Sequence, residues 1–463
     1  SRSACPTPSS ILRRLLAKFV TNLSDRTGIA FLNDTLNRHD VIIHGRCHSR
    51  FEPVAEVLRK QVIRFGGGGA ASVYLDGECV VDIWAGEARH DGTPWDHDTM
   101  SICFSGTKGV AATAVHMLAT DGLLDYDAPV ARYWPEFGCN GKQTITVRQV
   151  LAHQAGLHKT VPLVDQLTDI LDWDAIVERL ARTEPDFHPG TANGYHAVTF
   201  GWLVGELVHR VSGQSFSEFV QQRIVEPLGL DGLRIGEADT EMDRLADLVG
   251  IPALRRHDAE PLPEGYSAPS WLPPGPVRSL LRRGLTPANM KELFTHPAFW
   301  KACLPAMNGV CTARSLGKMY AALSLGGELD GVRLLSEDVL RQATEVQMKR
   351  PDRVVFYPLH WRLGYHRADA MLMNVPSAFG HFGMGGAGGW ANPELKLAAA
   401  HVHNGFPLSP IGQMRTVMIT AAIYESLGLY RGIRHTLRHG PRLELLGDTH
   451  PLQNLTNFKT LRT

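Results

Sequence analysis

The chain has 463 residues, 44% of them hydrophobic and 20% charged, which is enough for one large globular domain with insertions or for two domains. Its 47 Lys and Arg residues equal its 47 Asp and Glu residues, which argues against a generally basic nucleic-acid-binding protein. No run of about 18 apolar residues is uninterrupted, so the sequence predicts no membrane span.

The cysteine and histidine content indicates neither a disulfide framework nor a metal site. Seven cysteines are scattered along the chain without a Cys-x-x-Cys pair, which favours a reducing compartment and hence a cytoplasmic location. Residues 44–48 read His-Gly-Arg-Cys-His, but this spacing fits no common zinc site. We therefore expect no metal and no cofactor.

Residues 1–50 are predicted to form an N-terminal extension. After a polar start, apolar residues recur at helical spacing over residues 11–23, with basic residues between them. Such a basic amphipathic helix suits peripheral contact with a membrane surface or with a partner. A helix packed on the body of the protein would show the same pattern, so both interpretations stay open.

A helix and a β-hairpin are predicted next. Apolar spacing indicates a helix over residues 51–62, and two β-rich runs, 71–75 and 78–84, are joined by Asp76-Gly77. An Asp-Gly pair between two such runs is typical of a hairpin turn.

The segment 104–110, Phe-Ser-Gly-Thr-Lys-Gly-Val, opens an Ala-rich apolar helix that we expect to end before Gly122. Ser105 and Lys108 are three residues apart, so both side chains lie on one face of that helix. A serine hydroxyl is a weak nucleophile until a base takes its proton, and a lysine in a desolvated pocket can be that base. Taken alone, the pair fits an N-cap serine followed by a solvated lysine better than it fits a catalytic pair.

The middle of the chain is predicted to be mostly helical. Thr146 is placed to cap a helix that ends at a turn at Gly156, and Tyr195 lies in a loop just before a helix of small and large residues. Residues 250–300 are broken by prolines and carry large apolar side chains. Such a segment is typical of a lid or pocket wall, or of a packed surface excursion. Its large apolar residues include Trp271, Phe294, Phe299 and Trp300.

The last third is predicted to return to a sheet. Helices are expected at 312–325 and 336–346, a strand-like run from Val354 to Tyr365, a strand over 395–403 and a helix at about 410–427. Two early strands and three late ones around a helical middle predict one antiparallel sheet completed by both ends of the chain.

Three short sequence motifs occur along the chain in a characteristic order. Ser105-x-x-Lys108, Tyr195 and His381-Phe382-Gly383 resemble the signature motifs of the serine β-lactamase and penicillin-binding-protein family. Their order and spacing look most like the class C branch and the family VIII carboxylesterases. Segments 145–157 and 308–316 are also similar to segments common in that family.

The resemblance covers about residues 50–427 and implies a mixed α+β fold, with an antiparallel sheet flanked by helices and an all-helical subdomain. We accordingly expect a catalytic domain over 51–430, with the helical subdomain and lid at roughly 125–345 inserted between the sheet halves, and a C-terminal tail over 431–463.

The resemblance also implies roles. Ser105 would be the acylated nucleophile and Lys108 its pKa partner. Tyr195 would act as a phenolate-like base and proton shuttle, which requires a lowered pKa. His381 would take the place of the lysine of the Lys-Thr-Gly strand and donate a hydrogen bond towards Tyr195 or the substrate while titrating near neutrality.

The same resemblance implies an oxyanion hole formed by the backbone N–H groups of Ser105 and Met384. Gly383 would let the strand approach the substrate closely. Phe382, Trp271 and Trp300 are the expected substrate-binding side chains.

Two departures from the family pattern bear on the substrate. β-Lactamases carry Tyr-x-Asn where this chain has Tyr195-His196-Ala197, and Phe382 replaces a small hydroxyl residue. Both changes favour an uncharged small-molecule ester, and hence a serine carboxylesterase that hydrolyses esters or transfers their acyl group. The alternatives are a β-lactamase or D-alanyl-peptide hydrolase, and a filament-forming protein with a weak site. We also expect a homo-oligomer, and we expect no binding of nucleic acid.

Overall fold

The computed structural model describes residues 41–160, 163–164, 167–249, 293–294, 296–368, 377–406 and 415–429. Val41–Thr463 forms one compact unit, and Ser1–Asp40 is a separate one. The first strand, β1 (His44–Cys47), therefore belongs to the compact unit, although its residues fall in the range predicted as an extension. The predicted helix over 11–23 and the tail over 431–463 lie outside the described residues.

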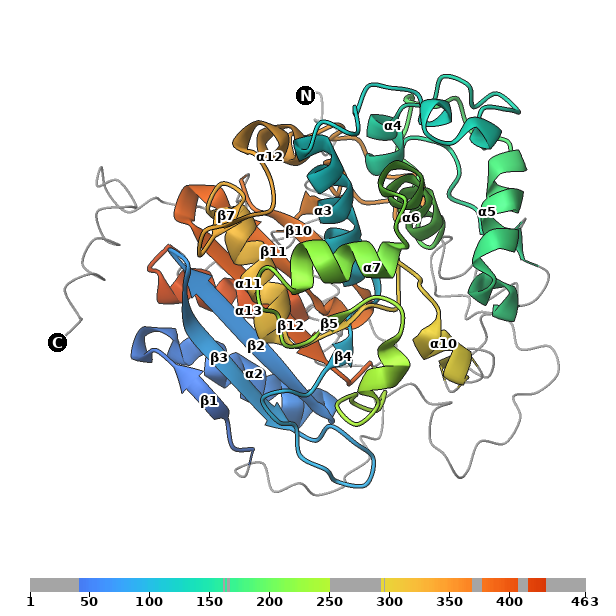
Figure 1. Cartoon of the computed structure of the whole chain (residues 1–463). Coiled ribbons are helices and arrows are strands. Elements are labelled where there is room, and N and C mark those ends of the chain that lie inside the picture. Colours follow the sequence, from blue (N-terminus) through green and yellow to red (C-terminus); the bar gives the residue numbers. More distant parts are fainter. Residues whose placement is uncertain are drawn as a thin grey trace, which may run out of the picture. The chain divides into compact units, whose positions relative to one another are not determined.

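One antiparallel sheet of seven strands organises the unit (Figure 1), in the order β1-β3-β2-β12-β11-β10-β9. Its two halves meet where β12 pairs with β2, in register from Leu397 with Leu75 to His403 with Gly69. The prediction that both ends of the chain complete one sheet is confirmed. The further strands are β2 (Gly68–Leu75), β3 (Glu78–Gly86), β9 (His366–Arg367), β10 (Phe379–Phe382), β11 (Gly388–Asn392) and β12 (Leu397–His403).

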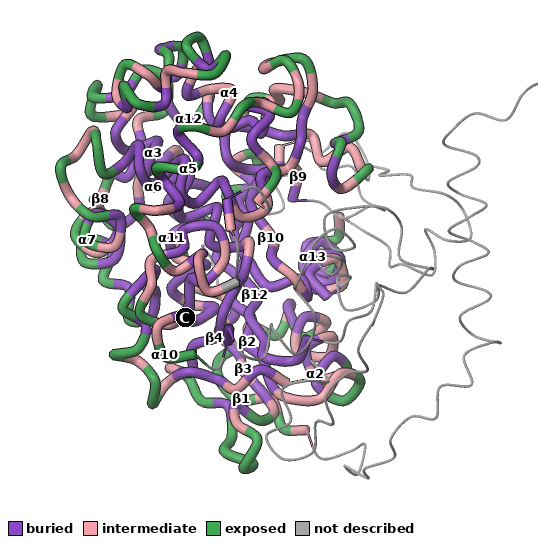
Figure 2. The backbone as a smooth tube through the Cα atoms, turned by 90° about the vertical axis from the view of Figure 1, so that its right-hand side faces the viewer, coloured by how far each residue is buried: buried purple, intermediate pink, exposed green. Residues whose placement is uncertain are grey.

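Helices cover both faces of this sheet, and they explain why β2 and β12 are buried along their whole length (Figure 2). On one face lie α2 (Glu52–Phe65) and α13 (Arg415–Ser426), and on the other lies α11 (Ala313–Ser324). Alternate residues of β2 accordingly enter two separate hydrophobic clusters, Ala71 and Val73 on one side and Ala70 and Tyr74 on the other.

The helical part begins with α3 (Thr107–Thr120), which packs against α6 (Thr199–Ser212) on one side and contacts β10 on the other. In Figure 1 the teal and green helices gather beside α3, away from the blue strands. They include α4 (Val147–Leu151), α5 (Trp173–Arg182) and α7 (Phe216–Val220). The start of α3, which Ser105 precedes by two residues, is therefore at the junction of sheet and helices.

Local signals in the sequence place several of these elements. Thr146 caps α4 in a reciprocal capping box, with Thr146 Oγ1 accepting from the Gln149 N–H and Gln149 Oε1 from the Thr146 N–H. The remaining short elements are β4 (Ser101–Ile102), β5 (Leu233–Arg234), β6 (Val310–Cys311), β7 (Glu328–Leu329), β8 (Val332–Arg333), α10 (Pro297–Lys301) and α12 (Glu337–Thr344). Among the described helices, none is long and apolar enough to cross a bilayer.

One predicted element is wrong. The run from Val354 to Tyr365 was expected to be a strand, but only the next two residues form β9. The side chain of Asp352 accepts the backbone N–H groups of Val354 and Val355 at 2.7 and 3.1 Å, so these groups are not available to a sheet. Phe356 then adopts a left-handed φ of 55°, which turns the chain away from an extended path.

Candidate active site

Ser105 lies on a single 3₁₀ turn, Phe104–Gly106, that leads directly into α3. Phe104 has a left-handed φ of 44°, a conformation that costs a non-glycine residue about 1–2 kcal/mol. Its ring packs edge-on against Phe294 and Phe406, with centroids 5.7 and 4.9 Å apart. Each such aromatic contact contributes about 0.5–1.5 kcal/mol, enough to hold the strained turn that presents Ser105.

Lys108 is completely buried, and its Nζ has three neighbours. It lies 2.9 Å from Ser105 Oγ, 2.7 Å from the carbonyl oxygen of Ala197 and 2.8 Å from that of Ala306. Burial lowers the pKa of Lys108 well below its ordinary value. A neutral amine has two N–H groups and one lone pair, so the two carbonyls take the hydrogens and the lone pair faces the serine hydroxyl.

Tyr195 is half-buried, and its hydroxyl lies 2.8 Å from Ser105 Oγ. The predicted lowering of its pKa is wrong. Burial raises the pKa of Tyr195, and the negative charge of Asp352 acts in the same direction, against the opposing hydrogen bond to Ser105. Tyr195 is therefore a neutral phenol near pH 7, suited to donating a proton rather than to taking one as a phenolate.

His381 is 1% exposed, and burial lowers its pKa well below the usual histidine range. The expectation that it titrates near neutrality is therefore wrong. Its Nδ1 lies 3.2 Å from the carbonyl oxygen of Phe382, and because a carbonyl only accepts, Nδ1 carries the hydrogen. Nε2 is then an acceptor, with no partner among the described residues. His381 contributes a lone pair, not the N–H predicted.

A second histidine supports this strand from beside it. His366 Nε2 accepts the backbone N–H of Phe382 at 3.2 Å, and its Nδ1 donates to the carbonyl of Arg367 at 2.8 Å. Both ring nitrogens are thus satisfied in the neutral form, and burial lowers the pKa of His366 to about 4. The imidazole rings of His366 and His381 are 4.6 Å apart.

Gly383 brings the end of β10 against the nucleophile. A Cβ at this position would lie 2.0 Å from the carbonyl oxygen of Cys103 and 2.9 Å from the backbone nitrogen of Ser105, so only glycine fits. The next residue, Met384, begins the turn Met384–Gly386. The backbone N–H groups of Ser105 and Met384 therefore lie on adjoining segments, as an oxyanion hole requires.

Two side chains form hydrogen bonds to the turn that follows Gly383. His403 of β12 donates from Nε2 to the carbonyl of Gly385 at 2.9 Å, and Thr416 of α13 donates from its hydroxyl to the carbonyl of Gly386. Both bonds fix peptide groups beside Met384 without involving its N–H.

Among the described residues, the predicted substrate-binding side chains form no hydrogen bond with Ser105. Phe382 is half-buried and its ring contacts that of His366 at 5.5 Å. Trp300 donates from Nε1 to the carbonyl of Phe294 at 3.1 Å, and Phe294 in turn packs on Phe104. That Trp300 lines an acyl pocket stays a prediction, and Trp271 lies outside the described residues.

Sequence reasoning missed four contributors to the site. Ala306 and Ala197 act through backbone carbonyls, which side-chain identity does not signal. Asp352 accepts the backbone N–H of Tyr195 at 3.2 Å, and Trp361 lies against the Tyr195 ring. Trp361 lies in the segment that was predicted to be a strand and Asp352 lies two residues before that segment, so no separate role was sought for either.

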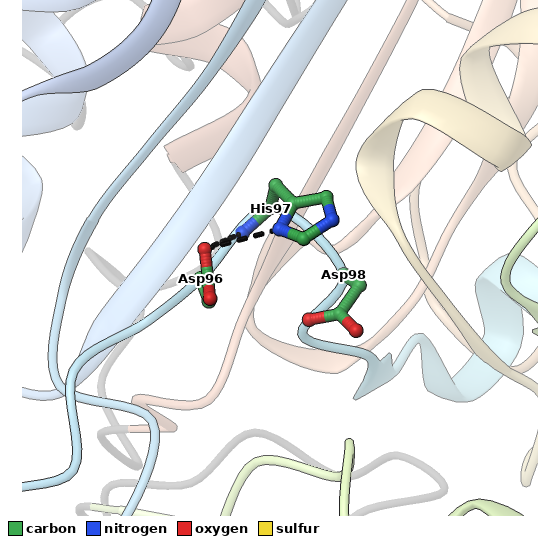
Figure 3. Close-up of side chains that lie close together, drawn as sticks. All are labelled: Asp96, His97 and Asp98. Carbon is green, nitrogen blue, oxygen red and sulfur yellow. Dashed lines mark hydrogen bonds and ion pairs between the residues drawn. The ribbon is translucent and has the colours of Figure 1, made fainter.

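Asp96, His97 and Asp98 are the group of three potential metal ligands among the described residues (Figure 3). They are consecutive on a largely exposed turn. Asp96 Oδ1 accepts from the backbone N–H and Nδ1 of His97 at 2.6 and 3.1 Å, and Asp98 pairs with Arg244 at 3.5 Å. These local bonds account for the arrangement, and we assign it no role in the site.

Gly383→Ala is expected to abolish most ester turnover, because the new methyl group must displace either Ser105 or the Cys103 carbonyl. We expect a fall in kcat/KM of at least about 100-fold, the scale of losing one oxyanion donor. Gly331→Ala is a contrasting control: its φ of 79° strains an alanine, whereas Gly383 has an extended backbone, and open space surrounds Gly331. The control should lose stability and keep its kcat/KM; equal losses in both variants would contradict the steric argument.

Comparisons with known proteins agree with this geometry. The beta-lactamase family model matches residues 58–422. The esterase/beta-lactamase LipL of Mycobacterium tuberculosis is 42% identical over 358 residues, covering 74% of this chain and 78% of LipL. The crystal structure of a family VIII carboxylesterase covers 83% of this chain and 100% of its own, with 33% identity and a TM-score of 0.71.

A penicillin-binding protein homologue from Caulobacter crescentus superimposes similarly, with 34% identity, a TM-score of 0.72 and coverage of 83% of this chain and 100% of its own. These matches confirm the mixed fold with its antiparallel sheet, and they confirm the resemblance drawn from the motifs. The chain belongs to the beta-lactamase family, and it is a serine hydrolase.

Proposed function

We propose that this protein cleaves uncharged carboxylic esters through an acyl-enzyme on Ser105. The observation that carries the proposal is the environment of Lys108 Nζ, whose two carbonyl partners leave a lone pair for the serine hydroxyl. Ester hydrolysis by a serine is also the activity that the names of its relatives indicate at the level of the family.

In the proposed reaction Lys108 takes the proton of Ser105 as Oγ attacks the ester carbonyl. The developing oxyanion is stabilised by the N–H groups of Ser105 and Met384. Tyr195, 2.8 Å from the same Oγ, donates its proton to the departing alkoxide and recovers one from Lys108. Water then attacks the acyl group with Lys108 again as the base, which restores Ser105.

The charge of the site favours an uncharged substrate. Of the four predicted catalytic residues, Lys108 and His381 are the basic ones, and Lys108 is buried with its contacts already made. His381 stays neutral, and Phe382 offers no hydroxyl to a substrate carboxylate. These four residues therefore offer no free cation to the carboxylate that β-lactams carry, and burying that carboxylate beside them would cost desolvation energy.

The test is a chain-length series of p-nitrophenyl esters beside a chromogenic cephalosporin. Each buried methylene contributes about 0.8 kcal/mol, so kcat/KM should rise a few-fold per carbon over short to medium acyl chains and then fall. Phe294→Ala, which changes the aromatic contact next to Phe104, should flatten this profile. A cephalosporin turned over faster than every ester would make the β-lactamase alternative the better one.

The pH dependence of kcat/KM follows from the direction of the pKa shift of Lys108. The base must be neutral, so activity should be full above the pKa of Lys108 and fall as the pH drops through it. That midpoint should lie well below the ordinary lysine value of about 10.4. A pH series on wild type and His381→Asn checks this. If the acid limb disappears in the histidine variant, His381 rather than Lys108 titrates.

Location and assembly remain proposals. The six cysteines in the described part of the chain are all free thiols, which supports a cytoplasmic location. Size-exclusion chromatography at several concentrations would test a homo-oligomer, and co-sedimentation of the full chain with anionic vesicles would test membrane contact through residues 11–23.

A further inference from the structure

Asp352 is a carboxylate 1% exposed, and its two oxygens have different partners. Oδ1 accepts the backbone N–H groups of Tyr195 at 3.2 Å, Val354 at 2.7 Å and Val355 at 3.1 Å. Oδ2 accepts the indole Nε1–H of Trp361 at 2.9 Å. Four N–H donors on one buried carboxylate offset much of its desolvation cost, and they fix its orientation.

The hydrogen bond to Asp352 holds the Trp361 indole against the ring of Tyr195. The two rings are stacked, with centroids 5.3 Å apart and an interplanar angle of 21°. Trp361 is itself 1% exposed and also contacts His153, whose ring centroid is 4.2 Å from that of Trp361 and 5.2 Å from that of Tyr195. Packed against both Trp361 and His153, the phenol ring of Tyr195 has little freedom to tilt.

Asp352 thus acts on Tyr195 in two ways. It accepts the backbone N–H of Tyr195 directly, and it orients the Tyr195 ring through Trp361. The Tyr195 hydroxyl at the far end of that ring is 2.8 Å from Ser105 Oγ, a distance at which a small tilt would break the contact. We propose that Asp352 and Trp361 are positioning residues that hold Tyr195 as the proton donor to the leaving group. This inference rests on the proposed ester cleavage.

The surroundings of Tyr195 agree with a donor that keeps its proton. The titratable groups facing it are Asp352, Lys108, whose Nζ is 5.1 Å from the ring centroid, and the neutral His153 and His381. Burial raises the pKa of Tyr195, and the charge of Asp352 raises it further. The contacts of Tyr195 with Asp352 and Trp361 therefore favour a protonated phenol that is held beside Ser105.

The test uses two butyrate esters that form the same acyl-enzyme but differ in their leaving groups. p-Nitrophenolate departs as an anion and needs little help from an acid, whereas ethoxide must be protonated as it leaves. Loss of a positioned donor should therefore slow ethyl butyrate about 10²- to 10⁴-fold more than p-nitrophenyl butyrate, the scale of general acid catalysis.

Asp352→Asn is nearly isosteric and keeps an oxygen for the three backbone N–H groups, but its amide faces the Trp361 N–H with a second donor. Trp361→Phe keeps an aromatic ring and loses the bond. Both should shift the ratio of the two rates as Tyr195→Phe does, and adding either to Tyr195→Phe should shift it no further. Trp134→Phe, at another tryptophan that is 1% exposed, is the control and should leave the ratio unchanged.

The outcomes separate the two proposals. Wild-type turnover of both esters with an unchanged ratio in a folded Asp352→Asn or Trp361→Phe protein would overturn the positioning role alone. If wild type turned over neither ester, the proposed function would fail and this inference would fall with it. If the asparagine variant does not fold, the phenylalanine variant still decides the matter.

Discussion

Ser105→Ala should lose ester turnover by at least about 10⁴-fold while keeping its fold, because it removes the only atom that can carry the acyl group in this mechanism. The hydroxyl has two side-chain contacts, with Lys108 Nζ at 2.9 Å and with the Tyr195 hydroxyl at 2.8 Å. Neither contact supports the hydrophobic core, so the melting temperature should change little.

Ser101→Ala is the matched control for this experiment. Ser101 is 1% exposed, lies four residues earlier in β4 and donates to the carbonyl of His403 at 2.9 Å. Its loss should cost stability and leave most of kcat. Retention of more than a few per cent of activity by Ser105→Ala would remove Ser105 from the reaction.

Lys108→Met and Tyr195→Phe are each expected to lower kcat by about 10³-fold or more, and the double variant should be little worse than the more damaging single one. Both side chains contact the same oxygen, and groups that act as one proton-transfer unit are strongly non-additive. Single-turnover kinetics on the three variants give the comparison. Additive losses would mean that the two residues serve separate steps.

The chain offers a close control for the lysine. Lys142 is as buried as Lys108 and also donates to two backbone carbonyls, those of Cys139 at 3.0 Å and Thr183 at 2.7 Å. It has no serine beside it in the described structure. Lys142→Met should therefore reproduce the cost in stability without the loss of kcat, and equal losses of kcat would show that the effect of Lys108→Met is structural.

Local patterns in the sequence predicted the elements whose causes are local. The Asp76-Gly77 turn, the Thr146 cap and the spacing of Ser105 and Lys108 all depend on residues a few positions apart. Predicting one sheet from both ends of the chain also succeeded, because the strands flank a long helical middle.

The features that the sequence could not predict depend on burial and on which backbone and side-chain groups the fold brings together, even where these groups are close in sequence. Whether Tyr195 loses or keeps its proton is decided by burial and by Asp352, 157 residues further on. Which nitrogen of His381 carries hydrogen is decided by a carbonyl oriented by the local fold. The segment after Asp352 looked like a strand from its composition, yet its backbone donors bind a side chain instead.

Intact-mass spectrometry after brief mixing with p-nitrophenyl butyrate tests the central claim most directly. We expect wild-type protein to gain the mass of one butyryl group, peptide mapping to place it on Ser105, and the adduct to decay at the rate of turnover. Ser105→Ala should gain nothing. Turnover without any adduct on Ser105, or an adduct on another residue that decays at the turnover rate, would contradict an acyl-enzyme on this serine.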